Sequence, residues 1–356
     1  MPFAQSLARA SLSRLAATAT LVLLGAVPAL PAQNAIPRSS GVGGFGIFAL
    51  AAYSGRTNFF ASGPPLIGAI SRPVTTSVFA APDELKAAAA LVGGEVNYTF
   101  ANTRTQLFAL GSLEDVFQLD VAIQLGVRQE LPDKSIATVN AIVTPFPQKL
   151  WVDPYVEFAV RDFDKVNFPG FRLVWSRILG TGLELTFTDR FFVFDAEQSG
   201  QWLVGQGRLD PDDVDLLDRN GDNLSFQTGY HFRAGRHRFE PSVTYGRDNR
   251  NGAAVSSDGF GARLNYRYLD PRFAIDANLG YAQRDHDAIH PLYGERVSRD
   301  RVGGSITAAV PIELLGSKKW NLWASAEYIR EDSNVDFFES RLSALTLGIG
   351  WRGLRQ

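Results

Sequence analysis

Two groups of titratable side chains in this sequence have the residue types that bind metal ions. The first group is acidic and consists of Asp210, Asp212, Asp213, Asp215, Asp218 and Asp222. The stretch 218–222 is weakly similar to a calcium-binding loop, but its glycine comes too early for the spacing of an EF-hand. A short helix explains the same residues, because Asp210 can act as its N-cap and Pro211 fits its first position. We therefore predict a helix here, with calcium binding as the alternative.

The second group comprises His286, Asp287 and His290. A metal ion would need the three side chains to converge, and Pro291 argues against a helix that would bring them together. We expect these residues to lie in a solvated loop. We predict no metal ion and no cofactor for the chain.

Hydrolytic catalysis would require a histidine, a serine and a third polar residue at one site. Of the four histidines, His231 is the one predicted to lie on an inward-facing strand position, and the pattern places no serine beside it. We therefore predict that the protein is not an enzyme, and a membrane-embedded hydrolase is the third of three functional hypotheses.

Charged residues recur on the polar side of the alternating segments described below. We select as lumen and selectivity candidates Arg263, Arg267, Arg233, Arg284, Asp276, Glu240 and Glu327. A ring of guanidinium groups lowers the barrier for anions, and arginine binds carboxylate or phosphate in a bidentate manner. The alternative is that the acidic members pair with the arginines and only neutralise them inside a narrow interior.

The elements that carry these charges show strict alternation of apolar and polar residues. In residues 260–268 and 273–281, every second residue is apolar or aromatic and the residues between are polar, charged or small. Side chains alternate faces along a strand, so each segment has one apolar face and one polar face. Repeated along an exported chain, this pattern is typical of a transmembrane β-barrel with lipid outside and a polar lumen inside. A large soluble all-β protein is the alternative.

Residues 1–32 have the features of a cleaved secretory signal peptide. Arg9 and Arg14 precede an apolar run, and small residues at Ala29 and Ala32 offer cleavage sites. An uncleaved anchor is the alternative, but Pro28 and Pro31 shorten the run below the roughly 20 residues that a spanning helix needs. The chain has no cysteine, which excludes lipoprotein acylation and disulfides.

Composition excludes a nucleic-acid-binding protein. Removal of residues 1–32 leaves 33 Lys and Arg against 37 Asp and Glu, a net charge of −4, and no basic stripe is present. No later segment is apolar over the roughly 18 residues of a helical membrane span. We divide the chain into a signal peptide (1–32), a short periplasmic segment (33–41), an outer-membrane β-barrel (42–351) and a C-terminal tail (352–356).

We predict an all-β, antiparallel, up-and-down barrel of about fourteen strands, with twelve as the alternative. The strands are expected at 42–53, 88–100, 103–111, 116–130, 135–144, 169–179, 183–194, 223–234, 238–249, 257–269, 272–284, 299–311, 319–331 and 340–351. Connections alternate between short turns and long loops, which matches the periplasmic turns and outer loops of such barrels. A brief helical turn is expected at Ala87–Ala90, after Pro82, Asp83 and Glu84.

Aromatic residues mark both ends of the strands. Phe273 and Trp351 lie beside short turns, whereas Tyr245, Tyr281 and Tyr328 lie toward the long loops. Two such girdles bracket the apolar band of an outer-membrane barrel. The last strand is amphipathic and ends near Trp351, which resembles the signal read by the outer-membrane assembly machinery.

Several short phrases are similar to a family of Gram-negative outer-membrane β-barrels described as domain of unknown function 2860. They are VNYTF (96–100), TQLF (105–108), QLGVR (124–128), WVDPY (151–155), EQSG (197–200), LLDRN (216–220) and DSNVDFF (332–338). They occur in the same order over most of residues 90–351. The resemblance implies an outer-membrane barrel without an agreed substrate or reaction.

The leading functional hypothesis is a passive or weakly selective channel for small polar or anionic solutes. Barrels of about eight strands are filled by side chains and those of sixteen contain an aqueous channel, so fourteen strands favour a pore. A barrel plugged by its loops, with a structural or adhesive role in the envelope, is the second hypothesis. The expected partners are outer-membrane lipid and lipopolysaccharide, the assembly machinery and small solutes.

Overall fold

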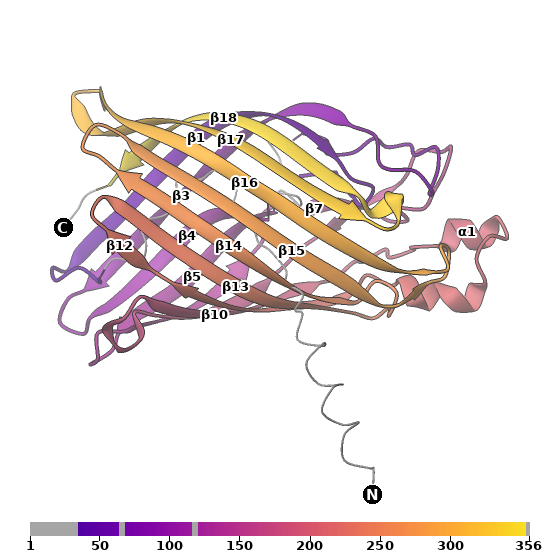
Figure 1. The fold of residues 1–356 in the computed structure, drawn as a ribbon, viewed down its shortest axis with the longest axis horizontal. Helices are drawn as coiled ribbons and strands as arrows, with labels where there is room; N and C mark the ends of the chain where they lie inside the picture. Colours follow the sequence, from indigo (N-terminus) through magenta and orange to yellow (C-terminus); the bar gives the residue numbers. More distant parts are fainter. Residues whose placement is uncertain (1–34, 64–67, 116–119, 354–356) are drawn as a thin grey trace, which may run out of the picture.

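The structure, a computed structural model, describes residues 35–63, 68–115 and 120–353, and the predicted signal peptide lies outside these ranges. A closed 14-strand antiparallel barrel dominates the fold (Figure 1). Its wall consists of β1 (Gly41–Arg56), β3 (Leu85–Phe100), β4 (Thr105–Asp115), β5 (Asp120–Glu130), β6 (Ile136–Val143), β9 (Gly170–Ser176), β10 (Leu183–Phe192), β11 (Gly221–Tyr230), β13 (His237–Arg250), β14 (Ser257–Leu269), β15 (Ala274–His290), β16 (Glu295–Leu314), β17 (Ser317–Ser333) and β18 (Ser340–Arg352).

The first and last strands of the wall close the barrel. β1 pairs with β18 from Phe45 opposite Arg352 to Arg56 opposite Arg341. The short strand β12 (Phe232–Ala234) continues β11 after an interruption at His231 and pairs with the start of β13. The predicted fold class and the fourteen predicted strands are confirmed.

The alternation in the sequence separates a lipid-like exterior from a polar interior. Ile306 and Leu347 are more than half exposed on the outside, although both lie in the middle of long paired strands. Inward positions on β16 and β17 include the buried Thr307 and Ser325, whose hydroxyl groups form a hydrogen bond of 2.9 Å. Apolar side chains exposed in this way avoid water only when the wall is surrounded by lipid.

Two sequence predictions of local structure were wrong. Ala87–Ala90 belongs to β3 instead of a helical turn, because β1 offers these residues strand partners such as Tyr53 and Ala52. Pairing with a neighbouring strand overrides the helix propensity of alanine. The loop expected between the strands 272–284 and 299–311 is also much shorter, since β15 extends to His290 and β16 starts at Glu295.

The long connections form a folded cap over one end of the barrel. It contains a small sheet of β2 (Phe60–Ser62), β7 (Gln148–Trp151) and β8 (Phe163–Val166), and the helices α1 (Gln201–Gly205), η2 (Pro211–Leu217) and η3 (Asp336–Phe338). Figure 1 shows α1 at the end of the barrel opposite to β12. A further 3-10 helix, η1 (Ile178–Gly180), lies in a short turn. None of the helices in the described ranges has the length and apolarity to cross a membrane.

The cap has an apolar core of its own. Its fully buried side chains come from separate loops and include Val78, Tyr155, Leu203, Leu217 and Phe337. The rings of Tyr155 and Phe337 stack with their centroids 5.2 Å apart. The helix predicted in the acidic loop is present as η2, where the Asp210 side chain accepts a hydrogen bond from the Asp212 amide. The long loops therefore pack together instead of extending into solvent.

Single-cysteine labelling tests which end of the barrel faces the cell exterior. The chain has no natural cysteine, so Asp215→Cys in the cap and Lys318→Cys in a short turn each provide one exposed thiol. We expect a membrane-impermeant maleimide to label the cap position in intact cells, and the turn position only after the outer membrane is broken. The opposite pattern would reverse the orientation.

Candidate functional site

A cavity of about 420 Å³, lined by charged and aromatic side chains, lies inside the barrel beneath the cap. Its lining comes mainly from β9, β10, β11, β13, β14, β15 and β16, and Phe59 and Phe338 of the cap lie over it. The cationic lining residues are Arg172, Arg190, Arg219, Arg250, Arg263, Arg284, Arg299 and Arg301. The acidic lining residues are Glu184, Glu240 and Asp248. We call this space the arginine cavity.

Two carboxylates organise four of the guanidinium groups. Asp248 accepts a close contact from Arg284 and a bond of 3.3 Å from Arg250. Glu331 on β17 forms ion pairs with Arg299 at 3.3 Å and with Arg301 at 2.6 Å. Four guanidinium groups against two carboxylates leave a positive charge balance. Arg299 Nε and Arg263 Nε are buried without a hydrogen-bond partner among the described residues.

The sequence candidates are divided between the cavity and other parts of the barrel. Arg263, Arg284 and Glu240 line the cavity. Arg267 and Asp276 form an ion pair on adjacent strands, which agrees with the alternative that acidic residues neutralise the arginines.

Two further candidates lie outside the arginine cavity. The exposed Arg233 donates from Nε to the Gly235 carbonyl at 2.7 Å, so it belongs to a turn. Glu327 is buried on the inner face of β17.

The histidine pair of β15 occupies the boundary between cavity and cap. The prediction that His286 and His290 are solvated was wrong, since both are buried. His286 Nδ1 lies 2.6 Å from the Ala254 carbonyl, and its Nε2 has no partner among the described groups. His290 Nε2 lies 2.9 Å from the Tyr155 hydroxyl. Asp287 points to the other face of the strand and pairs with Arg247 at 2.5 Å, so the three side chains do not converge.

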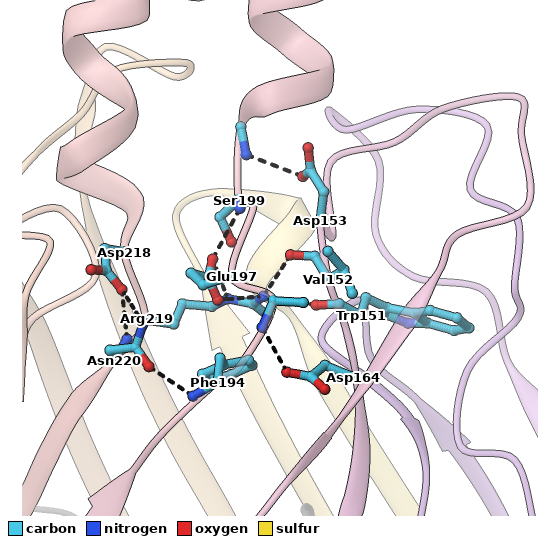
Figure 2. Close-up of polar contacts among 12 residues, drawn as sticks. Trp151, Val152, Asp153, Asp164, Phe194, Glu197, Ser199, Asp218, Arg219 and Asn220 are labelled. Atoms are coloured by element: carbon cyan, nitrogen blue, oxygen red, sulfur yellow. Dashed lines mark hydrogen bonds and ion pairs between the residues drawn. The ribbon is translucent and has the colours of Figure 1, made fainter.

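Polar contacts between three loops hold the cap over the cavity (Figure 2). Arg219 donates from Nε to Glu197 Oε2 at 2.9 Å, and from Nη2 to the carbonyls of Trp151 at 2.7 Å and Val152 at 3.0 Å. Both charged side chains are about nine-tenths buried, and the guanidinium lies 4.5 Å from the Phe194 ring centroid. We call Trp151, Val152, Glu197 and Arg219 the cap junction.

Asp153 extends the junction to the start of α1. Its Oδ1 accepts from the amides of Tyr155 at 2.9 Å and Gly200 at 3.1 Å, and its Oδ2 accepts from the Trp202 amide at 2.9 Å. The amides of Gly200 and Trp202 are donors that the start of a helix leaves unpaired, so the carboxylate caps α1 from a different loop. Three of the family-like phrases, at 151–155, 197–200 and 216–220, thus meet at one place.

Arg161 fixes a second part of the cap. Its guanidinium donates to the carbonyls of Asn58 at 3.1 Å and Arg72 at 2.6 Å and lies 4.4 Å from the Trp151 ring centroid. Burial lowers the pKa of Arg161 to about 10, and the Asp153 carboxylate opposes that shift. The residue therefore stays charged near neutral pH. Burial also raises the pKa of Tyr155, so its hydroxyl keeps the proton that it shares with His290.

A second polar network lies on the inner wall toward the short turns. Arg128 binds both oxygens of Glu95, at 2.8 and 2.7 Å, and also donates to Gln106 Oε1 at 2.8 Å. Asn97 donates to Glu95 Oε1 at 2.7 Å. Three more family-like phrases, at 96–100, 105–108 and 124–128, supply Asn97, Gln106 and Arg128.

Arg104 attaches the N-terminal segment to this end of the barrel. It donates to the carbonyls of Ile36 at 2.6 Å and Pro37 at 2.7 Å and pairs with Glu130 at 2.5 Å. The side chain of Ile36 is also buried. Part of the segment predicted as periplasmic is therefore fixed against the barrel.

Sequence reasoning missed several residues of the cavity, although the signal was present. Asp248 and Arg250 follow Glu240 at even intervals along β13, so the same face carries all three. Arg299 and Arg301 on β16 share a face in the same way, opposite Glu331 of β17. Asp248, Arg299 and Arg301 fall within the expected strands 238–249 and 299–311, and Arg250 lies one residue beyond the first of them.

The chain was compared with known protein families and structures. The model of the family DUF2860, described as a protein of unknown function, matches residues 66–352. This match confirms the resemblance seen in the sequence. No curated protein matches the chain significantly.

Solved outer-membrane proteins have a similar fold at very low sequence identity. A loop-deletion mutant of OmpT from Vibrio cholerae has 10% identity and a TM-score of 0.38, over 88% of this chain and 99% of that one. A FadL homologue of Pseudomonas aeruginosa has 11% identity and a TM-score of 0.41, over 87% and 90%. The outer membrane channel DcaP of Acinetobacter baumannii has 8% identity and a TM-score of 0.37, over 88% and 97%. These similarities describe the barrel fold alone.

Proposed function

The chain belongs to the DUF2860 family, and from this premise we propose that it is an outer-membrane channel for small anionic solutes. The solutes carry carboxylate or phosphate groups, which the arginine cavity binds on their way through the barrel. The apolar exterior of the wall supports the location, since exposed side chains such as Ile306 and Leu347 require lipid around them.

The observation that carries the proposal is the charge of the cavity lining. Eight arginines and three acidic side chains line a space of about 420 Å³, a volume within the range of small-molecule binding sites. Buried N–H donors such as Arg263 Nε gain a partner when a carboxylate or phosphate enters. The pairs with Asp248 and Glu331 hold the guanidinium groups in place without neutralising all of them.

The cap determines when a solute can enter from the loop side. Phe59 and Phe338 cover the cavity, and the cap junction holds the loops above it. Passage therefore requires part of the cap to move. This arrangement favours slow or gated transport over the open diffusion of a wide pore.

Ion selectivity in planar bilayers tests the proposal. At roughly 8 Å and an effective dielectric constant of about 20, each guanidinium contributes about 2 kcal/mol to the energy of a monovalent anion. We expect Arg263→Gln combined with Arg284→Gln to lower the ratio of anion to cation permeability by at least about 10-fold. Arg233→Gln, outside the cavity, is the matched control and should leave the reversal potential unchanged.

Equal selectivity of the double variant and the wild-type barrel, both folded, would contradict an anion-selective lumen. Absence of any conductance would instead favour a plugged barrel with a structural or adhesive role. The buried core and buried ion pair of the cap favour this second candidate.

The third hypothesis, a hydrolase, lacks support at His231. This histidine lies between Glu184 and Glu240, which is not the serine arrangement that a hydrolase would need.

A further inference from the structure

Three side chains with metal-ligating atoms meet on the inner wall near the short turns. Glu184 lies on β10, His231 lies between β11 and β12, and Glu240 lies on β13. His231 Nε2 is 3.6 Å from Glu184 Oε2, and His231 Nδ1 is 3.4 Å from Glu240 Oε2. One ligand atom from each residue can be chosen so that all lie within 4.8 Å of one another.

Backbone pairing explains why these residues meet. The His231 amide donates to the Gly182 carbonyl at 2.8 Å, which places the imidazole next to the start of β10. Any side chain at Gly182 would collide with the His231 carbonyl, because a Cβ there would lie 1.9 Å from that oxygen. Gly229 is the strand partner of Glu184 on one side and of Ser242 on the other. Because it has no side chain, the space beside the Glu184 carboxylate stays open.

We propose that Glu184, His231 and Glu240 bind a divalent transition-metal ion such as Zn²⁺. One imidazole nitrogen and two carboxylate oxygens are a ligand set that such ions accept, and the remaining positions are left for water or a solute. Bonds of about 2.1 Å place tetrahedral ligand atoms about 3.4 Å apart. An ion binds only one imidazole nitrogen, and the two contacts of His231 use different nitrogens. One carboxylate therefore already lies at this separation from the bound nitrogen, and the other, whose ligand atom lies within 4.8 Å, reaches the ion by a side-chain rotation.

Within this cluster of charged groups, a proton on His231 competes with the metal ion. Arg263 contributes a positive charge near Glu240, and the Asn265 amide is bonded to the same carboxylate. With neutral His231, the two carboxylates and Arg263 leave a net charge of −1. A proton on the imidazole neutralises the cluster, and a metal ion must displace that proton. The affinity for the metal therefore rises with pH.

The site adds a property to the cavity that the arginines do not provide. Glu184 and Glu240 both line the arginine cavity. A bound ion places a positive charge with open coordination positions at its edge, where a solute oxygen can become a ligand. The inference rests on the side chains themselves and does not require that the barrel transports anions.

Zinc titration of the full-length barrel in detergent tests the proposal. After removal of metal with a chelator, we expect isothermal titration calorimetry near neutral pH to find one Zn²⁺ per chain. The variants Glu184→Gln, Glu240→Gln and His231→Asn should each weaken binding by about 100-fold, since each removes a direct ligand. Ca²⁺ should bind much more weakly, because it prefers six to eight oxygen ligands.

His237→Asn is the matched control. His237 lies on the neighbouring turn and contacts the Tyr266 hydroxyl at 2.9 Å, so its loss should leave zinc binding unchanged. Absence of zinc binding by the folded wild-type barrel would overturn the proposal, as would equal binding by the glutamine variants and the wild type. If His231→Asn does not fold, the visible absorption spectrum of bound Co²⁺ is compared between the wild type and the two glutamine variants. Spectra identical to that of the wild type in both variants would also overturn the proposal.

Discussion

Replacement of Arg219 by alanine is expected to open the cap. The variant leaves Glu197 buried without its cation and removes the donors to the Trp151 and Val152 carbonyls. Loss of one partner of a buried ion pair costs about 3–5 kcal/mol. At about 1.4 kcal/mol per factor of ten, the population with an open cap should rise roughly 100-fold or more.

Limited trypsin digestion of the folded barrel measures this opening. Arg208 lies between α1 and η2, and cleavage after it should become much faster when the cap junction is lost. Single-channel conductance should increase in the same variant. Arg330→Ala is the control, because its ion pair with Asp332 is nearly half exposed and contributes at most about 1 kcal/mol. If the Arg219 variant has the same digestion rate and conductance as the wild type, the cap junction does not hold the cap closed.

The substitution Ile306→Arg is expected to destabilise the inserted barrel. Ile306 faces outward on β16, between the Tyr281–Val302 pair at one end of the apolar band and the Ile312–Trp320 pair at the other. A cation at the middle of the lipid-facing surface costs about 2–4 kcal/mol. We expect Ile306→Arg to lower the urea midpoint of the refolded barrel and to reduce its heat-modifiable form in cells.

Leu315→Arg provides the comparison. Leu315 is 89% exposed in a short turn, where the same charge costs about 0–1 kcal/mol. The contrast between the variants therefore reports the position of the membrane and not the tolerance of the chain for arginine. Equal urea midpoints for Ile306→Arg and Leu315→Arg would mean that Ile306 does not face the lipid.

The wall of the barrel was predictable because its signal is local. Outward residues such as Leu264 and Leu279 alternate with inward ones within each strand, so a single segment reveals both faces. The ends of strands were less predictable. β15 continues through His286 and His290, where the inward side chains become buried against the cap instead of facing water.

The cap could not be predicted, because its contacts join residues that are distant in the sequence. The sequence contains Arg219 and Glu197, but nothing local indicates that the carbonyls of Trp151 and Val152 complete the same site. His231 illustrates the same difficulty. Its inward position was predicted, whereas its two acidic neighbours come from strands whose register sets the contact.

The pairing of β1 with β18 has a consequence for the folding pathway. Every other strand pair of the described wall joins neighbours in the wall sequence, so hairpins can form early at low entropic cost. The β1–β18 seam alone joins opposite ends of the barrel chain. Because closing this long loop has the largest entropic cost, we expect the seam to form last. Until then both edges remain unpaired and able to join a second chain. The rate of seam closure should therefore decide between insertion and aggregation during biogenesis.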